Sequence, residues 1–140
     1  MFAKKIDAQV RIGLAGGEVR DGVMCFIPGA AIRGKAEITV EEDLTADHVW
    51  IRLEWFTEGR GDRDAQTIEE IDAYQGVMTG GTPQTVDFAF TLPEAPWSYA
   101  GHYINIIWAI TVHVDRSRTF KEITYHERFV MAPDRHAVTP

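Results

Sequence analysis

Two residues near the end of the most regular apolar segment have the chemistry of metal ligands or of an acid–base pair. His113 and Asp115 are two residues apart in a segment that reads as a strand, so their side chains point the same way. An imidazole beside a carboxylate can hold a divalent metal or exchange a proton. His126, on the predicted returning strand, could approach them. The spacing offers no evident third ligand, and we expect neither a metal nor a cofactor.

The loop after the predicted strand at 48–57 begins like a calcium-binding loop. Asp62 and Asp64 occupy the first and third ligand positions of such a loop. The pattern then requires glycine at position six and glutamate at position twelve, where this chain has Thr67 and Ala73. We therefore interpret the two aspartates as solvated loop charges.

Two residue types that serve as nucleophiles lack the surroundings that would activate them. Cys25 stands inside an apolar run with no neighbouring base to lower its thiol pKa. Ser98 lies in a proline-rich turn and lacks the flanking glycines of a nucleophile elbow. Both are interpreted as structural, and the chain is predicted not to be an enzyme.

The strand predicted for His48–Thr57 has aromatic side chains on the face that should be polar. Its two faces alternate, with Val49, Ile51, Leu53 and Trp55 on one and Trp50, Arg52, Glu54 and Phe56 on the other. Tryptophan and arginine are enriched among the residues that dominate binding at protein interfaces. Either a partner or another segment of the same chain must cover this face. We expect the second set to bind a partner, which is another protein or a second copy of the chain.

A second aromatic group lies around the proline-rich turn. Trp97, Tyr99 and Tyr103 could stack on a sugar ring, as aromatic residues do in sandwich-type carbohydrate binders. We interpret them rather as a plug at one end of the core. A small-ligand or carbohydrate-binding role through this loop remains the alternative function.

The elements that must position these residues are strands. Apolar residues fall on alternate positions in most segments, and most clearly in Ile104, Ile106, Trp108, Ile110, Val112 and Val114, which should form one buried face. Only Ala65–Tyr74 is ambiguous, and we favour a strand there over a short helix. The predicted strands are 5–14, 23–27, 32–40, 48–57, 65–74, 86–92, 104–115 and 120–131, with 133–140 as a tail.

Seven or eight short strands separated by turns predict an all-β, two-sheet antiparallel β-sandwich of immunoglobulin-like or arrestin-like type. A closed barrel is the alternative. The short strand at Val23–Ile27 is stopped by Pro28-Gly29. It is expected either to lie at an open sheet edge or to terminate there, since proline cannot donate to a strand ladder.

The composition indicates which kinds of partner and which cellular compartment to expect. The 140 residues suit one domain, 1–140, and carry a net charge of −7, which repels nucleic acid. No apolar run approaches the roughly 18 residues that span a bilayer. A single cysteine cannot form an internal disulfide, which fits a reducing compartment. We expect a cytoplasmic protein that binds neither nucleic acid nor, through a spanning segment, a membrane.

Three segments together resemble the N-terminal domain of arrestins and arrestin-related proteins. They are Ile27–Glu42, His48–Trp55 and Val86–Asp115. The features that resemble the family are a Pro-Gly turn before a Gly-initiated strand, a Phe-rich strand that closes on Leu-Pro, and a small-residue turn followed by a strand that leads to an aromatic residue. The residues at matching places are Pro28, Gly29, Gly34, Phe88, Phe90, Leu92, Pro93, Pro96, Ser98, Gly101 and Trp108. The resemblance covers about two thirds of the chain, which is long enough for one of the two arrestin domains. It implies an adaptor that binds proteins without catalysis.

The expected function is therefore a non-enzymatic protein-interaction or assembly module. Docking is expected through the face formed by Trp50, Arg52, Glu54 and Phe56. The second-ranked route is the addition of a partner strand at the open edge near Val23–Ile27.

Overall fold

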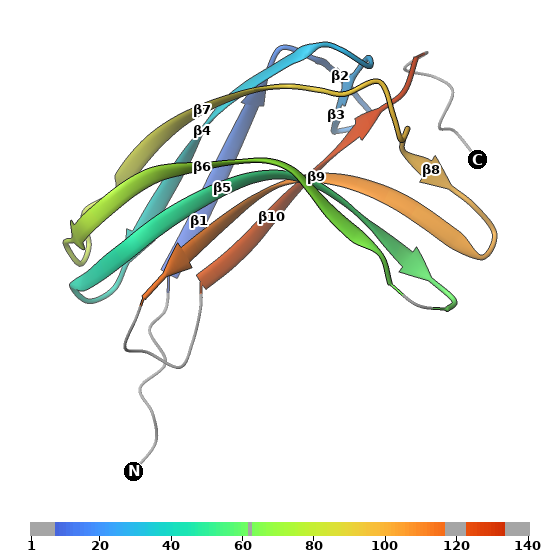
Figure 1. Cartoon of the computed structure of the whole chain (residues 1–140). Helices are drawn as coiled ribbons and strands as arrows, with labels where there is room; N and C mark the ends of the chain where they lie inside the picture. Colours follow the sequence, from blue (N-terminus) through green and yellow to red (C-terminus); the bar gives the residue numbers. More distant parts are fainter. Residues whose placement is uncertain (1–7, 62, 117–122, 134–140) are drawn as a thin grey trace.

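The computed structural model describes residues 8–61, 63–116 and 123–133, within which ten strands form two sheets (Figure 1). The predicted turn at 115–119 and the predicted tail lie largely outside these residues. The strands are β1 (Ala8–Ala15), β2 (Glu18–Arg20), β3 (Val23–Phe26), β4 (Ala31–Val40), β5 (Leu44–Gly59), β6 (Ala65–Met78), β7 (Gln84–Thr91), β8 (Tyr99–Ala100), β9 (Ile104–Asp115) and β10 (Ile123–Met131).

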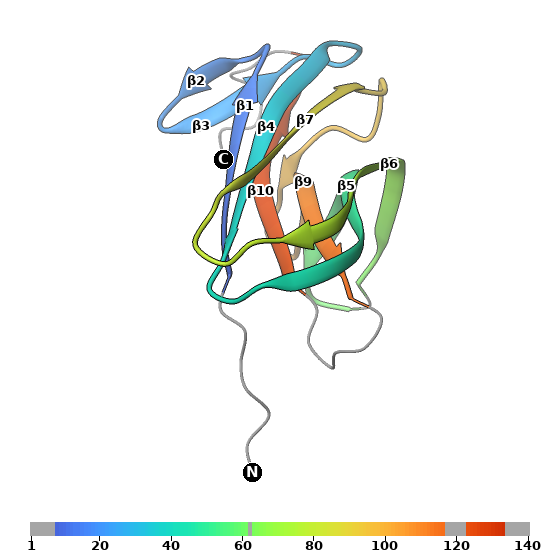
Figure 2. The same cartoon turned by 90° about the vertical axis from the view of Figure 1, so that its left-hand side faces the viewer.

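The two sheets confirm a sandwich rather than a barrel. One has three strands in the order β1-β4-β7, which stand side by side in Figure 2. The other has the order β2-β3-β10-β9-β5-β6, with β8 paired to β9. All pairs are antiparallel except β3 with β10. The short strands β2 and β8 add to the eight predicted from the sequence.

The prediction of an open edge at Val23–Ile27 is wrong. β3 ends at Phe26, before the Pro-Gly turn, but it pairs with β2 on one side and with β10 on the other. The hairpin from β2 to β3 makes this possible, because three residues of β2 cover the side that the sequence left open. Strand addition at β3 is therefore not an available docking route.

The core lies between the sheets and follows the predicted alternation. On β5, Val49, Ile51 and Leu53 are fully buried against the other sheet. Phe88 and Phe90, on β7, belong to the same core cluster. The centroids of their two rings lie 5.9 Å from each other. Burial of such alternating apolar side chains is the main term that favours this fold over the unfolded chain.

β9 lies between β5 and β10, and its anchor is Trp108. The Trp108 side chain is fully buried, and its indole Nε1 donates a 2.7 Å hydrogen bond to the Pro96 carbonyl. Ser98 holds the same loop: its amide donates to the Met131 carbonyl, and its hydroxyl accepts from the Met131 amide. The structural interpretation of Ser98 is confirmed. Ile104, by contrast, is 41% exposed, because β9 begins beyond the edge of the core.

The ambiguous segment at 65–74 is a strand. β6 pairs antiparallel with β5 over almost its whole length, from Ala65 opposite Phe56 to Met78 opposite Leu44. Three register shifts interrupt the pairing. Because β-bulges of this kind break the strict period of two, they account for the ambiguity of the apolar pattern. Cys25 is buried, as its apolar neighbours predict.

The inner face of β10 contains one acidic residue, Glu127, in the same parity as the buried Phe129 and Met131. Partial burial of the Glu127 carboxyl raises its pKa above the ordinary value. The folded chain then binds this proton more tightly than the unfolded chain does. The contribution of Glu127 to stability is therefore complete below its unfolded pKa and is lost as the pH rises through its raised folded pKa.

The substitution Glu127→Gln should accordingly stabilise the protein at neutral pH but not in acid. The difference in unfolding free energy between variant and wild type should be near zero well below the ordinary glutamate pKa of about 4.3, and it should grow as the pH rises above that value. Urea denaturation at several pH values measures it. A difference that does not change with pH would contradict the raised pKa.

Candidate interaction surface

The four residues predicted to bind a partner share the outer face of β5, as their alternation requires. Each is half-buried in the described structure rather than fully exposed. β5 lies between β6 and β9, so side chains of both neighbours flank the four. The face is thus rigid, because a fully paired strand holds it.

At one end, Trp50 is covered by its own chain. The indole stacks on the His48 ring, with centroids 4.7 Å apart and planes at 25°. His48 Nδ1 lies 2.7 Å from Asp72 Oδ2, to which Gln75 Nε2 donates a second hydrogen bond of 2.6 Å. The hydrogen bond from His48, followed by that from Gln75, holds the pKa of Asp72 below its ordinary value. At this end, therefore, the side chains of His48, Asp72 and Gln75 hydrogen-bond to one another.

The centre of the face is a network that the sequence did not reveal. The Thr111 hydroxyl donates to the Glu54 carboxylate, and His126 Nδ1 lies 2.7 Å from the same hydroxyl. His126 Nδ1 is also 3.6 Å from Glu54 Oε1. Thr111 is almost fully buried, although its face should be wet. The signal that could have found it is a threonine in the middle of an otherwise apolar strand.

The predicted approach of His126 to His113 and Asp115 is wrong. His126 lies opposite Thr111 in the β9–β10 register, and His113 instead meets the Thr124 hydroxyl at 3.0 Å. The two-residue difference in register separates the histidines along the sheet. Among the described residues, no group of three or more His, Cys, Asp or Glu could hold a metal ion.

The other end of the face is built around Arg128, on β10. Its guanidinium carbon lies 5.4 Å from the centroid of the Phe56 ring, and its two terminal nitrogens lie 3.3 and 3.0 Å from the Glu58 carboxylate oxygens. The His126 ring approaches Phe56 from the side, with centroids 5.9 Å apart. A paired, planar cation above an aromatic ring is a favourable arrangement that also fixes the arginine.

Two hollows meet at the Arg128–Glu58 pair. One, of about 350 Å³, has Phe56 in its lining, and the other, of about 330 Å³, has Ile107 and Tyr99 in its lining. Glu58 and Arg128 line both. The outer face is therefore hollowed at its Phe56 end, whereas the Trp50 end is occupied by internal contacts.

Two hydrogen bonds between Thr57 and Asp64 close the loop beside the first hollow. Thr57 N donates to the Asp64 carbonyl and Asp64 N donates to the Thr57 hydroxyl, both at 2.9 Å. Thr67 and Ala73 lie within β6, so they cannot belong to a twelve-residue calcium loop. Asp62 lies outside the described residues.

The prediction that Trp97, Tyr99 and Tyr103 plug the core is wrong. Their side chains are 53%, 49% and 61% exposed. The end of the core is filled instead by Phe26, Trp108 and Phe129, with the Phe26 and Phe129 rings edge to face at 5.4 Å. Trp108 donates a hydrogen bond to the Pro96 carbonyl, and the loop residues that follow Pro96 lie outside the core.

No family model and no curated protein sequence matches this chain. Its structure is similar to the crystal structure of Spo0M, a sporulation control protein from Bacillus subtilis, with a TM-score of 0.67 and 17% sequence identity. The similarity covers 89% of this chain and 49% of the Spo0M chain, so this chain spans about half of that length. At this identity the likeness shows the fold alone. The fold is an arrestin-like, two-sheet β-sandwich, and among the described residues no helix is long and apolar enough to cross a membrane.

Proposed function

We propose that this chain is a non-enzymatic protein-interaction or assembly module that acts in the cytoplasm and docks through the outer face of β5. The observation that carries the proposal is the pair of hollows that meet at Arg128 and Glu58 beside the half-buried Phe56 ring. A partner side chain can enter such hollows at little entropic cost, because β5, β9 and β10 already hold their walls in place.

The side-chain contacts on the outer face of β5 suit the binding of a partner better than catalysis. Glu54 and His126 both contact the Thr111 hydroxyl, and Arg128 is paired with Glu58, so each of the three is engaged with a neighbouring side chain. Spo0M, which has a similar fold, is described as a sporulation control protein, and this regulatory role agrees with a module that acts by binding. The partner is another protein or a second copy of this chain.

Replacing Trp50 and Phe56 together with serine should remove partner binding and leave the fold intact. Because both rings are only half-buried, the unfolding free energy should fall by no more than about 1–2 kcal/mol, less than the roughly 3–5 kcal/mol of a core truncation. Retention of the partner on immobilised wild-type and variant protein measures binding, and urea denaturation measures stability. The matched control is Trp97→Ser with Tyr99→Ser, which should leave the same partner bound.

A small-ligand or carbohydrate-binding role through Trp97, Tyr99 and Tyr103 is the second candidate. The observation in its favour is the exposure of all three rings, together with the 5.5 Å approach of the Arg60 guanidinium to the Tyr103 ring. Stacking platforms for sugars need exposed aromatic faces of this kind. Glycan-array binding that is lost in the Trp97→Ser, Tyr99→Ser protein, with no protein partner retained, would favour this role over the first.

A further inference from the structure

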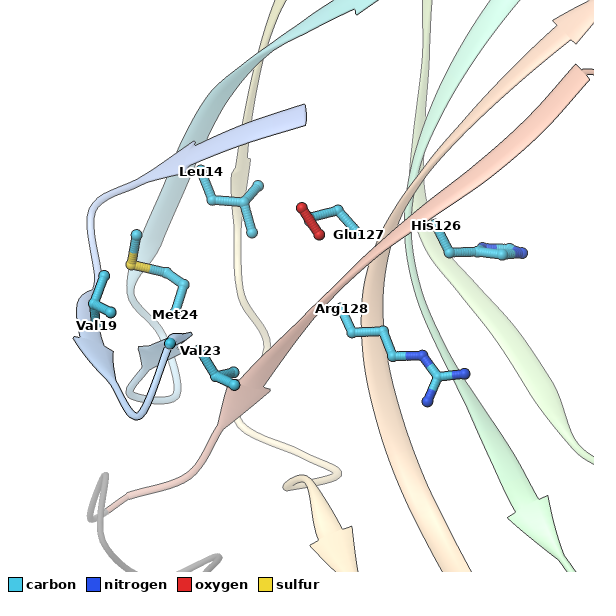
Figure 3. A pocket seen from close by; sticks show the side chains of 8 residues that line it. Leu14, Val19, Val23, Met24, His126, Glu127 and Arg128 are labelled. Carbon is cyan, nitrogen blue, oxygen red and sulfur yellow. The ribbon is translucent and has the colours of Figure 1, made fainter. Parts of the chain in front are cut away.

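A third and larger hollow is lined mainly by other elements, although His126 and Arg128 belong to its lining and to that of the Phe56 hollow. It has a volume of about 510 Å³ and is lined by the end of β1, the β2–β3 hairpin and the middle of β10 (Figure 3). We call it the hairpin groove and define it by Leu14, Val19, Val23, Met24 and Glu127.

The walls of the hairpin groove are apolar and partly uncovered. Val19 is 62% exposed and Val23 is 39% exposed, while Leu14 and Met24 are half-buried beside them. Covering such side chains on binding is favourable by about 25 cal/mol for each Å² removed from water. The groove therefore suits an apolar segment.

Among the described residues that line the groove, Glu127 alone has a carboxylate. It projects from β10 toward Leu14, whereas the His126 and Arg128 side chains, which also belong to the lining, project to the opposite side of the strand (Figure 3). Arg128 is paired there with Glu58. Within the described part of the chain, neither a hydrogen bond nor an ion pair involves the Glu127 carboxylate.

A carboxylate in an apolar groove decides which segment can bind. An acidic or wholly apolar segment would cover Glu127 without a counter-charge and incur the full desolvation cost of the carboxylate. In a segment with one cationic side chain, a charge-assisted hydrogen bond from that side chain to Glu127 offsets the desolvation cost. The net charge of −7 on the whole chain also attracts a basic segment from a distance.

We propose that the hairpin groove binds an apolar segment of another protein that carries a lysine or arginine, and that Glu127 is the counter-ion of this cation. The groove shares His126 and Arg128 with the Phe56 hollow. The proposal rests instead on Glu127, Val19 and Val23, so it does not depend on the function proposed for Trp50 and Phe56. Val19 and Val23 contact the apolar residues of the segment, and its cation reaches between them to Glu127.

Two capped, fluorescent peptides of sequence Leu-Val-X-Val-Leu test the proposal, where X is lysine in one and norleucine in the other. Wild-type protein should bind the lysine peptide about tenfold more tightly or better, as one charge-assisted hydrogen bond allows. The ratio of the two affinities should fall to about one in Glu127→Gln and should be unchanged in Glu69→Gln, a matched neutralisation on the exposed strand β6.

The ¹³C resonance of the Met24 methyl group, assigned with a Met24→Leu variant, locates the peptide independently. It should shift on titration with the lysine peptide in wild type and in the Trp50→Ser, Phe56→Ser protein alike. Failure of the lysine peptide to bind wild type at about 1 mM, the weak limit of specific binding, would overturn the proposal. So would a lysine preference that survives in Glu127→Gln, or binding that leaves the Met24 signal unmoved.

Discussion

Replacement of Trp108 with alanine is expected to lower the free energy of unfolding by about 3–5 kcal/mol, the largest effect of any single truncation considered for this fold. The side chain is fully buried, and its removal leaves a cavity beside Phe129, whose ring centroid lies 6.1 Å away. It also leaves the Pro96 carbonyl without its donor, which adds the cost of an unsatisfied buried acceptor.

Urea denaturation followed by circular dichroism measures the loss. Trp97→Ala is the matched control, because Trp97 also donates its indole nitrogen to a backbone carbonyl, that of Glu94 at 2.9 Å, but is 53% exposed. The control should lose less than about 1 kcal/mol. Equal losses in the two variants would contradict the assignment of Trp108, rather than the Trp97 loop, as the anchor of β9.

The substitution Gly34→Ala is expected to destabilise the protein by about 2–3 kcal/mol or to prevent folding. Gly34 lies in the middle of β4, the central strand of the smaller sheet. A methyl group there would collide with the carbonyl oxygen of Gly13 and with the Phe88 ring. Since the first of these belongs to the backbone of the neighbouring strand, the sheet itself must shift, and overpacking of this kind is costly.

Gly13→Ala provides the control, because a methyl group at Gly13 meets no atom within 4 Å. That variant should be neutral or more stable by up to about 1 kcal/mol, as alanine has less freedom to lose on folding. Thermal unfolding of the two variants in one buffer makes the comparison. If Gly34→Ala were as stable as Gly13→Ala, β1 and β4 could not approach as closely as the structure shows.

The strands could be predicted from the sequence because burial on a sheet follows a period of two. The alternation of Val49, Ile51 and Leu53, and that of Phe88 and Phe90, is short-range information that each segment carries by itself. The resemblance to arrestins, with its Pro-Gly turn and Trp108, was sufficient to predict the class of fold. Gly34 belongs to that pattern, and its close approach to Gly13 supplies the physical reason.

The contacts between strands could not be predicted, because they depend on register across residues far apart in the chain. Thr111 meets Glu54 only because β5 and β9 are neighbours with one particular register. Likewise, nothing local to Val23–Phe26 indicates that β10 will pair with it in parallel.

Local aromatic clustering also predicted burial where the loop turns outward, as at Trp97. Glu127 is a different case, because an acid in the apolar parity of Phe129 and Met131 is visible in the sequence. The β2–β3 hairpin, which forms the other wall of the groove beside Glu127, is not visible in the sequence.

Site-specific photocrosslinking tests most directly whether the outer face of β5 is the docking surface. The photoreactive residue p-benzoyl-L-phenylalanine would replace Phe56 in one protein and the exposed Lys35, on β4 of the opposite sheet, in another. A covalent product with a protein partner, or with a second copy of this chain, should form from position 56 and be absent from position 35. Products from position 35 alone, or equally from both, would contradict docking through this face.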